Sequence, residues 1–276
     1  MFMNVAKELQ AAKFGGYAIG AFNTSNLEVT KAICLAAREM DFPVIIQTTP
    51  SAIKYAGLKQ IYDIVRNEIE ESGIKAAIHL DHGKDWDVAK ACVDIGYPSV
   101  MIDGSKLPYD ENVALTKKVV EYAHERGVAV EAEIGVLGVE EGGESGSARG
   151  DSFSSPGQTA EFVKKTGIDS VAVAIGNAHG APAGEKLDLG LLHRISKTID
   201  IPLVIHGSSG LEDSDIITAI RSGVAKFNVD TLIRRSYLDG IYSVPKEEKD
   251  YRNLFEAAMV PVVEVVKQRI KLFSNN

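Results

Sequence analysis

Three His-Gly steps, each just after an apolar run, are the residues of this sequence best suited to chemistry. They are Asp81-His82-Gly83 after residues 77–80, His179-Gly180 after residues 171–175 and His206-Gly207 after residues 202–205. An acid beside an imidazole can exchange protons or hold a metal. Three imidazoles from three strand ends, with an acid beside them, are a common way to build an open catalytic zinc site. The sequence therefore predicts that these three histidines hold Zn²⁺ next to Asp81.

The elements that must bring these histidines together alternate regularly between short apolar strands and helical patterns. The expected strands are 17–22, 43–47, 76–80, 99–103, 128–133, 170–175, 202–205 and 224–229, with helices at 2–14, 27–40, 57–71, 84–96, 110–126, 157–166, 188–198, 213–222, from 231 and at 251–272. Each strand is a continuous apolar run, which is typical of parallel strands that are buried on both faces. This pattern favours a closed (β/α)8 TIM barrel with an extra N-terminal helix and C-terminal helices, as a single domain over residues 1–276.

An open, doubly wound sheet is the alternative fold, but no Gly-x-Gly-x-x-Gly turn follows the first strand. In a TIM barrel the active site lies at the carboxyl ends of the strands. Asp103, Glu133 and Asn228 fall at such ends together with the three histidines. The Gly-, Ser- and Glu-rich residues 135–156 interrupt the alternation and are expected to form an excursion outside the core.

Composition excludes several classes of function. The net charge of −8 and the pI of about 5.4 leave no basic surface for nucleic acid. Neither a signal peptide nor an apolar run of roughly 18 residues, long enough to cross a membrane, is present. Cys34 and Cys92 lie within amphipathic helical patterns, so we expect them to be buried and reduced. A cytoplasmic protein without nucleic-acid or membrane partners is the expectation.

Six motifs, in this order and spacing, resemble the class II, zinc-dependent ketose-bisphosphate aldolases. They are His79-Leu80-Asp81-His82-Gly83, Ser99-Val100-Met101-Ile102-Asp103-Gly104-Ser105, Val130-Glu131-Ala132-Glu133-Ile134-Gly135, Asn177-Ala178-His179-Gly180, His206-Gly207-Ser208-Ser209-Gly210-Leu211 and Asn228-Val229-Asp230-Thr231. The resemblance implies reversible cleavage of fructose or tagatose 1,6-bisphosphate to dihydroxyacetone phosphate and glyceraldehyde 3-phosphate. It also implies a small phosphorylated sugar as the substrate and a homodimer or homotetramer as the assembly.

Carried over residue by residue, the resemblance implies a role for each motif. His82, His179 and His206 are similar to the zinc ligands, and Glu133 to a carboxylate that enters the coordination in some states. Apart from the resemblance, Asp103 is a candidate accessory ligand, with a polar residue at the barrel rim as the alternative. Asp81 resembles the acid–base group at the C4 oxygen, and Glu141 the acid that moves the proton on the dihydroxyacetone-phosphate carbon. The implied phosphate cradle consists of Gly180, Gly207, Ser208, Ser209, Asn228, Val229, Asp230 and Thr231. A monovalent cation, Na⁺ or K⁺, is implied near that phosphate.

The chemistry requires these residue types. Cleavage between C3 and C4 leaves an enediolate, whose charge Zn²⁺ stabilises as a Lewis acid. One acid or base must serve the C4 oxygen and another the carbanion, so two separated carboxylates are needed. Asp81 and Glu141 meet this requirement, while Asn23 and Thr49 are further candidates for substrate contact. Glu131, two residues before Glu133, is expected behind the metal ligands.

The sequence departs from the family pattern at several positions. Val139 and Gly142 alter the loop around Glu141, and Pro182-Ala183 replace a frequent Tyr-Lys pair. Met259 stands where many relatives have an arginine for the distal phosphate, and a methionine cannot replace a bidentate guanidinium. A ketose monophosphate or a sugar acid without that phosphate is therefore the alternative substrate. Asp230 favours fructose-type stereochemistry.

Three other functions remain open from the sequence: a Schiff-base lyase, a zinc hydrolase and a barrel without catalytic activity. Lys226 in the eighth strand could form a Schiff base with a ketose. A zinc hydrolase is disfavoured because the first strand lacks a His-x-His pair. A non-catalytic barrel would be free to lose Asp81 or a histidine, and all of these are present.

Overall fold

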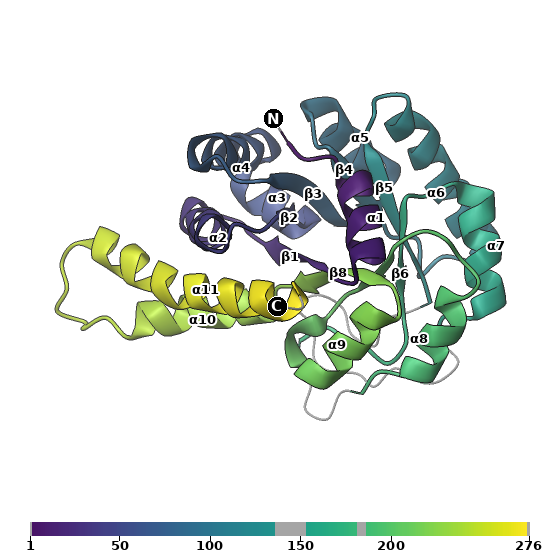
Figure 1. Cartoon of the computed structure of the whole chain (residues 1–276). Coiled ribbons are helices and arrows are strands. Elements are labelled where there is room, and N and C mark those ends of the chain that lie inside the picture. The colour runs from purple at the N-terminus through teal and green to yellow at the C-terminus, as the bar shows by residue number, and fades with distance from the viewer. Residues whose placement is uncertain (1, 136–152, 181–185, 275–276) are drawn as a thin grey trace.

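The computed structural model describes residues 2–135, 153–180 and 186–274, and within them eight parallel strands close into a barrel in sequence order (Figure 1). The strands are β1 (Ile19–Asn23), β2 (Val44–Thr48), β3 (Ala76–Gly83), β4 (Ser99–Ile102), β5 (Ala129–Ile134), β6 (Ser170–Val173), β7 (Leu203–Ile205) and β8 (Val224–Val229). Every residue of these strands is buried, as expected for strands with the barrel interior on one side and helices on the other. The predicted (β/α)8 fold is confirmed.

Helices surround the barrel on its outer side and apolar side chains fill the layer between them (Figure 1). They are α1 (Val5–Gly15), α2 (Leu27–Met40), α3 (Pro50–Ala56), α4 (Leu58–Ser72), α5 (Trp86–Ile95), α6 (Tyr109–His124), α7 (Pro156–Thr166), α8 (Leu189–Ser196), η2 (Ser208–Gly210, a 3-10 turn), α9 (Asp213–Arg221), α10 (Thr231–Tyr242) and α11 (Tyr251–Phe273). The sequence did not predict α3, which is only seven residues long and too short for a periodic pattern.

Polar side chains fix the points where strands give way to helices. Asn26, Asp85 and Asp188 each accept a hydrogen bond from a backbone N–H in the first turn of α2, α5 and α8. Thr49 does the same for α3. Such caps satisfy N–H groups that have no partner inside the helix. Helices α2, α3 and α5 therefore start within four residues of the carboxyl end of a strand, and the carboxyl ends of the strands form one face of the barrel.

Helix α1 closes the opposite, amino-terminal end of the barrel. Leu9 and Ala12 pack in a small apolar cluster with Ile19, Ala77 and Ala225, near the starts of strands. The ammonium of Lys13 donates to the carbonyls of residues 199–201, at 2.7 to 3.5 Å, just before β7. This arrangement confirms the predicted N-terminal helix, which packs against the starts of several strands.

Helices α10 and α11 pack against each other and extend beyond the barrel as a long hairpin (Figure 1). Their contact depends on Gly240, because a Cβ there would lie 2.6 Å from Ala258 Cα and 2.7 Å from the Ala257 carbonyl oxygen. Both contacts are with backbone atoms that cannot rotate away. In the described part of the chain no helix is long and apolar enough to cross a membrane, and Cys34 and Cys92 are free and buried, as expected.

Replacing Gly240 with alanine should separate α10 from α11 and lower the free energy of unfolding by about 1–3 kcal/mol, the usual cost of overpacking. Gly157 in α7 is the matched control, because a Cβ there meets no atom within 4 Å and alanine is the better helix former. Urea unfolding of both variants checks this expectation. Equal stability of the Gly240→Ala and Gly157→Ala proteins would contradict the close helix contact.

Candidate active site

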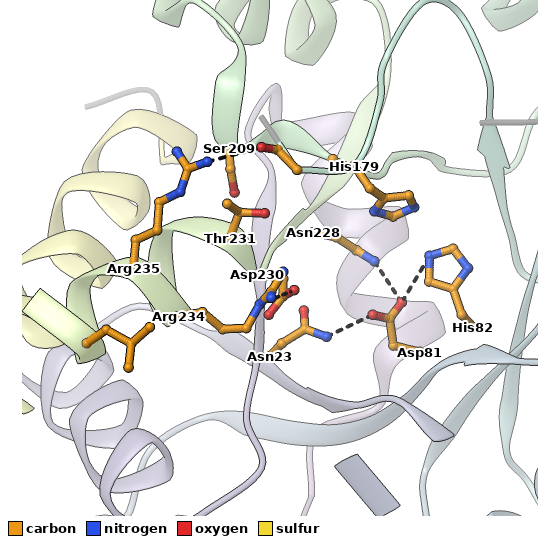
Figure 2. Close-up of a pocket in the computed structure, with 13 residues that line it drawn as sticks. Asn23, Asp81, His82, His179, Ser209, Asn228, Asp230, Thr231, Arg234 and Arg235 are labelled. Carbon is orange, nitrogen blue, oxygen red and sulfur yellow. Dashed lines mark hydrogen bonds and ion pairs between the residues drawn. The ribbon is translucent and has the colours of Figure 1, made fainter. Parts of the chain in front are cut away.

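The three predicted histidines meet at the carboxyl face of the barrel. His82 ends β3, His179 follows β6 and His206 follows β7, and one ring nitrogen of each lies within 4.8 Å of the others. The ring centroids of His82 and His206 are 4.6 Å apart, and those of His82 and His179 are 5.0 Å apart. Figure 2 shows His82 and His179 side by side above Asp81. The sequence-predicted cluster is thus assembled by the fold.

Local backbone geometry turns His82 toward this cluster. His82 has a φ of 49°, a left-handed conformation that is uncommon for residues other than glycine. The pairing of β3 with β4 also shifts register between Leu80 and Gly83. Such an irregularity re-aims a side chain near the end of a strand, and here it places the neighbours Asp81 and His82 on the same pocket.

Carboxylates orient two of the three imidazoles. His82 Nδ1 donates to Asp103 Oδ2 at 2.8 Å, and His206 Nε2 donates to Glu131 Oε1 at 2.9 Å. Asp103 is held in turn by the backbone N–H and hydroxyl of Ser105. Hydrogen bonds of this kind fix the tautomer of a metal-binding histidine. The nitrogens that remain, His82 Nε2 and His206 Nδ1, both present lone pairs.

These two nitrogens face each other at 2.9 Å. Two lone pairs at this distance need a shared cation, either a proton or a metal. Burial alone would lower the pKa of His82, but the surrounding carboxylates of Asp81, Asp103 and Glu133 raise it to about 10. Burial lowers the pKa of His179 to about 3, so that its imidazole stays neutral and able to bind a metal. The cluster is built to hold positive charge.

Glu133 lies beside the same cluster. Its Oε2 is buried, has no hydrogen-bond partner, and is 3.7 Å from His206 Nδ1. Burial and the nearby Asp103 raise the pKa of Glu133 well above its usual range. Glu133 and Asp103 form a second group with His82 that could hold a metal. A carboxyl oxygen without a partner next to three imidazoles is the donor set that Zn²⁺ prefers, so the residues fit this ion.

Asp81 is held as a carboxylate by amides from three other strands. Asn23 Nδ2 and Asn228 Nδ2 donate to it at 2.9 Å, and Gln47 Nε2 donates at 3.2 Å. Burial alone would raise the pKa of Asp81, but the charges of His82 and other neighbours bring it below its usual range. Its Oδ1 is 3.9 Å from His82 Nε2. Asp81 is therefore an ionised base with a fixed orientation beside the histidines (Figure 2).

A pocket of about 300 Å³ opens next to Asp81, His82 and His179. Among the predicted substrate residues it is lined by Asn23, Gly180, Gly207, Ser209, Asn228, Asp230 and Thr231. Gly207 has a φ of 69° and directly precedes η2, and Thr231 begins α10. The backbone N–H groups at the start of a helical turn are suited to bind a phosphate. The pocket thus joins the histidine cluster to backbone N–H groups of a kind that can bind an anion.

Three predicted substrate residues lie outside this lining. The hydroxyl of Ser208 donates to the Asn228 carbonyl at 2.6 Å, which ties η2 to β8. Val229 is fully buried in the apolar core. Thr49 caps α3 and lines a second pocket of about 390 Å³. Glu141, Val139, Gly142, Pro182 and Ala183 lie outside the described residues.

The second pocket adjoins the first and shares Asn23, Asp230 and Arg234 with it. Arg234 Nε donates to Asp230 Oδ2 at 2.8 Å, and Arg235 Nη2 donates to the Gly180 carbonyl at 3.3 Å. Tyr55 and Tyr237 also line the second pocket. Sequence reasoning gave these tyrosines no role, because Tyr55 lies on the unpredicted α3 and Tyr237 belongs to no recognisable motif.

The Schiff-base alternative meets an obstacle in the environment of Lys226. This lysine is fully buried, and its Nζ lies 2.9 and 3.0 Å from the two carboxylate oxygens of Glu131. It does not line the pocket that contains Asp81. A lysine nucleophile must lose its proton and reach the substrate, and Lys226 is paired and out of reach.

Comparison with known proteins agrees with this site. The family model for class II fructose-bisphosphate aldolase matches residues 3–276. A fructose-bisphosphate aldolase from Streptococcus pneumoniae is 40% identical over 99% of this chain and 98% of its own. A 6-phospho-5-dehydro-2-deoxy-D-gluconate aldolase from Bacillus licheniformis is 42% identical over 98% of this chain and 92% of its own.

Among solved structures, the YdjI aldolase from Escherichia coli K12 superposes with a TM-score of 0.87 at 30% identity, covering 99% of this chain and 97% of that one. The fold, the family match and the relatives all indicate a carbon–carbon lyase. This chain belongs to the class II fructose-bisphosphate aldolase family, whose members are generally zinc-dependent.

Proposed function

We propose that this protein reversibly cleaves a ketose 1,6-bisphosphate, fructose or tagatose 1,6-bisphosphate, to dihydroxyacetone phosphate and glyceraldehyde 3-phosphate. The observation that carries the proposal is one pocket in which an ionised Asp81 lies 3.9 Å from a ring nitrogen of the histidine cluster, with Gly207 and Thr231 lining the same pocket. His82, His179 and His206 would hold Zn²⁺, with Glu133 and Asp103 as further candidate ligands. When bound, the ion supplies Lewis-acid stabilisation of the charge that bond cleavage leaves on the substrate.

Asp81 is assigned the proton of the C4 hydroxyl. In the cleavage direction it accepts this proton while the C3–C4 bond breaks and the C4 oxygen becomes the aldehyde oxygen. In the synthetic direction it returns the proton. The amides of Asn23, Gln47 and Asn228 keep the carboxylate in place, and a fixed orientation is what makes a general base effective. Glu141 remains the predicted acid for the carbon of dihydroxyacetone phosphate.

The proximal phosphate would bind at Gly180, Gly207, Ser209 and Thr231. Gly207 lets the backbone turn sharply at this point, because its φ is positive and a Cβ would lie 2.1 Å from the Ala178 carbonyl oxygen. The starts of η2 and α10 line the same pocket, so their backbone N–H groups would be available to one phosphate. A monovalent cation, Na⁺ or K⁺, near this phosphate is part of the proposal, as is assembly into a homodimer or homotetramer.

A second candidate is the same cleavage of a ketose monophosphate or a sugar acid. It is favoured by Met259, which is half-buried and packs against the apolar core where relatives often carry an arginine. Arg234, which lines both pockets, is already paired with Asp230. The relative named 6-phospho-5-dehydro-2-deoxy-D-gluconate aldolase, 42% identical, acts by its name on a phosphorylated sugar acid.

Release of dihydroxyacetone phosphate should be measured from fructose 1,6-bisphosphate, tagatose 1,6-bisphosphate and fructose 1-phosphate, with and without EDTA. We expect cleavage of a bisphosphate that EDTA abolishes and added Zn²⁺ restores. Cleavage of the 1-phosphate alone would favour the second candidate. A zinc-loaded protein that cleaves no member of a wider panel of ketose phosphates and sugar acids would refute the proposal.

Changing Asp81 to alanine should leave Zn²⁺ bound but lower kcat by about 10²- to 10⁴-fold, the usual contribution of a general base. His82→Ala is the matched comparison, and we expect it to lose both metal and turnover because it removes a ligand. Metal content by atomic emission and steady-state kinetics distinguish the two variants. Normal turnover of the Asp81→Ala protein would remove Asp81 from the reaction.

Gly207→Ala should raise KM for the phosphorylated substrate at least tenfold, because the added Cβ must displace the Ala178 carbonyl and with it the backbone before Gly180, which lines the pocket. Gly73→Ala is the control: Gly73 has nearly the same φ, 67° against 69°, but a Cβ there meets nothing within 4 Å. Left-handed strain should cost both variants about 1–2 kcal/mol of stability, and the backbone clash should cost Gly207→Ala about 1–3 kcal/mol more. Equal KM values for the two would argue against a phosphate at Gly207.

A further inference from the structure

Below the residues that line the pocket lies a second polar layer inside the barrel. His79, Glu131 and Lys226 each precede a site residue by two positions on β3, β5 and β8. Side chains two apart on a strand point to the same face, so this layer faces the barrel interior one step further from the pocket. All three residues are at most 1% exposed. Removing ionisable side chains from water at this depth costs free energy of folding, and apolar residues at the same positions would not carry this cost.

The main contact in this layer joins Lys226 to Glu131. Lys226 Nζ is 3.0 Å from Glu131 Oε1 and 2.9 Å from Oε2. Neither residue lines the pocket that contains Asp81, so neither touches substrate there. A buried ion pair seldom stabilises a fold more than well-packed apolar residues of the same size would. The pair therefore needs an explanation other than the stability of the barrel.

Glu131 also reaches the metal cluster. The oxygen that accepts from Lys226, Oε1, accepts from His206 Nε2 as well, at 2.9 Å. A ring held at Nε2 directs its other nitrogen, Nδ1, toward His82 Nε2, 2.9 Å away. Glu131 thus connects a fixed ammonium on β8 to the orientation of a metal-binding imidazole after β7.

We infer that Lys226 is a positioning residue for the metal centre, and that it acts through Glu131 on the ring of His206. The inference rests on the zinc site of the proposed function. Lys226 holds the Glu131 carboxylate in one place by contacting both of its oxygens. The carboxylate then fixes the plane of the His206 ring and leaves Nδ1 free for the ion. Carboxylates that orient a metal-binding histidine typically contribute about 10- to 100-fold to metal affinity.

The test compares two lysines that are both held by oxygen acceptors. Lys226→Met removes the ammonium next to Glu131, and Lys13→Met removes the one that contacts the carbonyls of residues 199–201 at the opposite end of the barrel. The dissociation constant for Zn²⁺ is measured by chelator competition, and thermal unfolding of the metal-free proteins reports on folding. Zn²⁺ affinity should fall about 10- to 100-fold in Lys226→Met and stay unchanged in Lys13→Met.

A Co²⁺-substituted protein gives a readout that a role in packing alone would not change. The visible absorption of Co²⁺ depends on the geometry of its ligands, so Lys226→Met should alter the spectrum and Lys13→Met should not. A folded Lys226→Met protein with unchanged Zn²⁺ affinity and an unchanged Co²⁺ spectrum would overturn the inference. If the unaltered protein binds no Zn²⁺, it is instead the proposed zinc centre that fails.

Two double variants keep the inference testable if Lys226→Met does not fold. K226M/E131Q and K226M/E131L each remove both buried charges, a change that proteins tolerate better than the loss of one partner. The glutamine oxygen can still accept from His206 Nε2, whereas leucine cannot. Because Lys226 no longer holds residue 131, we expect Zn²⁺ affinity below that of the unaltered protein in both double variants, and lower with leucine than with glutamine. An affinity in K226M/E131Q equal to that of the unaltered protein would show that Lys226 is dispensable for the metal centre. Equal affinities in the two double variants would show that Glu131 does not anchor the ring, and either result would overturn the inference.

Discussion

The need to neutralise buried negative charge governs the carboxyl face of this barrel. Asp81, Glu131 and Glu133 are all at most 4% exposed, and Asp103 lies close by. A buried carboxylate without a partner costs several kcal/mol. Lys226 neutralises Glu131 by an ion pair. The carboxylate of Asp81 is stabilised by side-chain amides from three other strands. The remaining carboxylates lie next to the three imidazoles and raise the pKa of His82 to about 10. The cluster therefore stabilises a cation, either a proton or a metal ion.

Barrel closure is what makes such a concentration of charge possible. Asp81, Glu133 and Asn228 come from β3, β5 and β8, and none is a neighbour of another in sequence. The closed hydrogen-bond ladder holds these strand ends rigidly, so each carboxylate meets its partner without ordering a flexible loop. Rigid placement matters because a general base or a metal ligand loses most of its effect when it is displaced by about 1 Å.

The barrel and the histidine cluster could be predicted from the sequence because their signals are local. The apolar runs that lead to His82, His179 and His206 are each followed by a His-Gly step, and strand ends of a parallel barrel share one face. The sequence did not reveal α3, the Asp230–Arg234 pair in the pocket wall, or the link from Lys226 through Glu131 to His206. The contacts of Glu131 with Lys226 and His206 join residues 95 and 75 positions apart and depend on strand register, which no local pattern encodes. From the sequence alone Lys226 is a candidate nucleophile, and only the structure reveals its buried ion pair with Glu131.

Under the proposed function, chemistry and selectivity come from different parts of this molecule. Among the described residues, Asp81 and the three histidines lie on strands or in the loops that follow them, whereas the second pocket is lined mainly by α3, α10 and the turn before α2. Surface helices and turns tolerate substitution better than strands that are buried on both faces. A barrel of this design can keep one carbon–carbon cleavage while its helices adapt to different distal groups. Relatives of 40% and 42% identity bear the names of two different aldolases, which is compatible with this division.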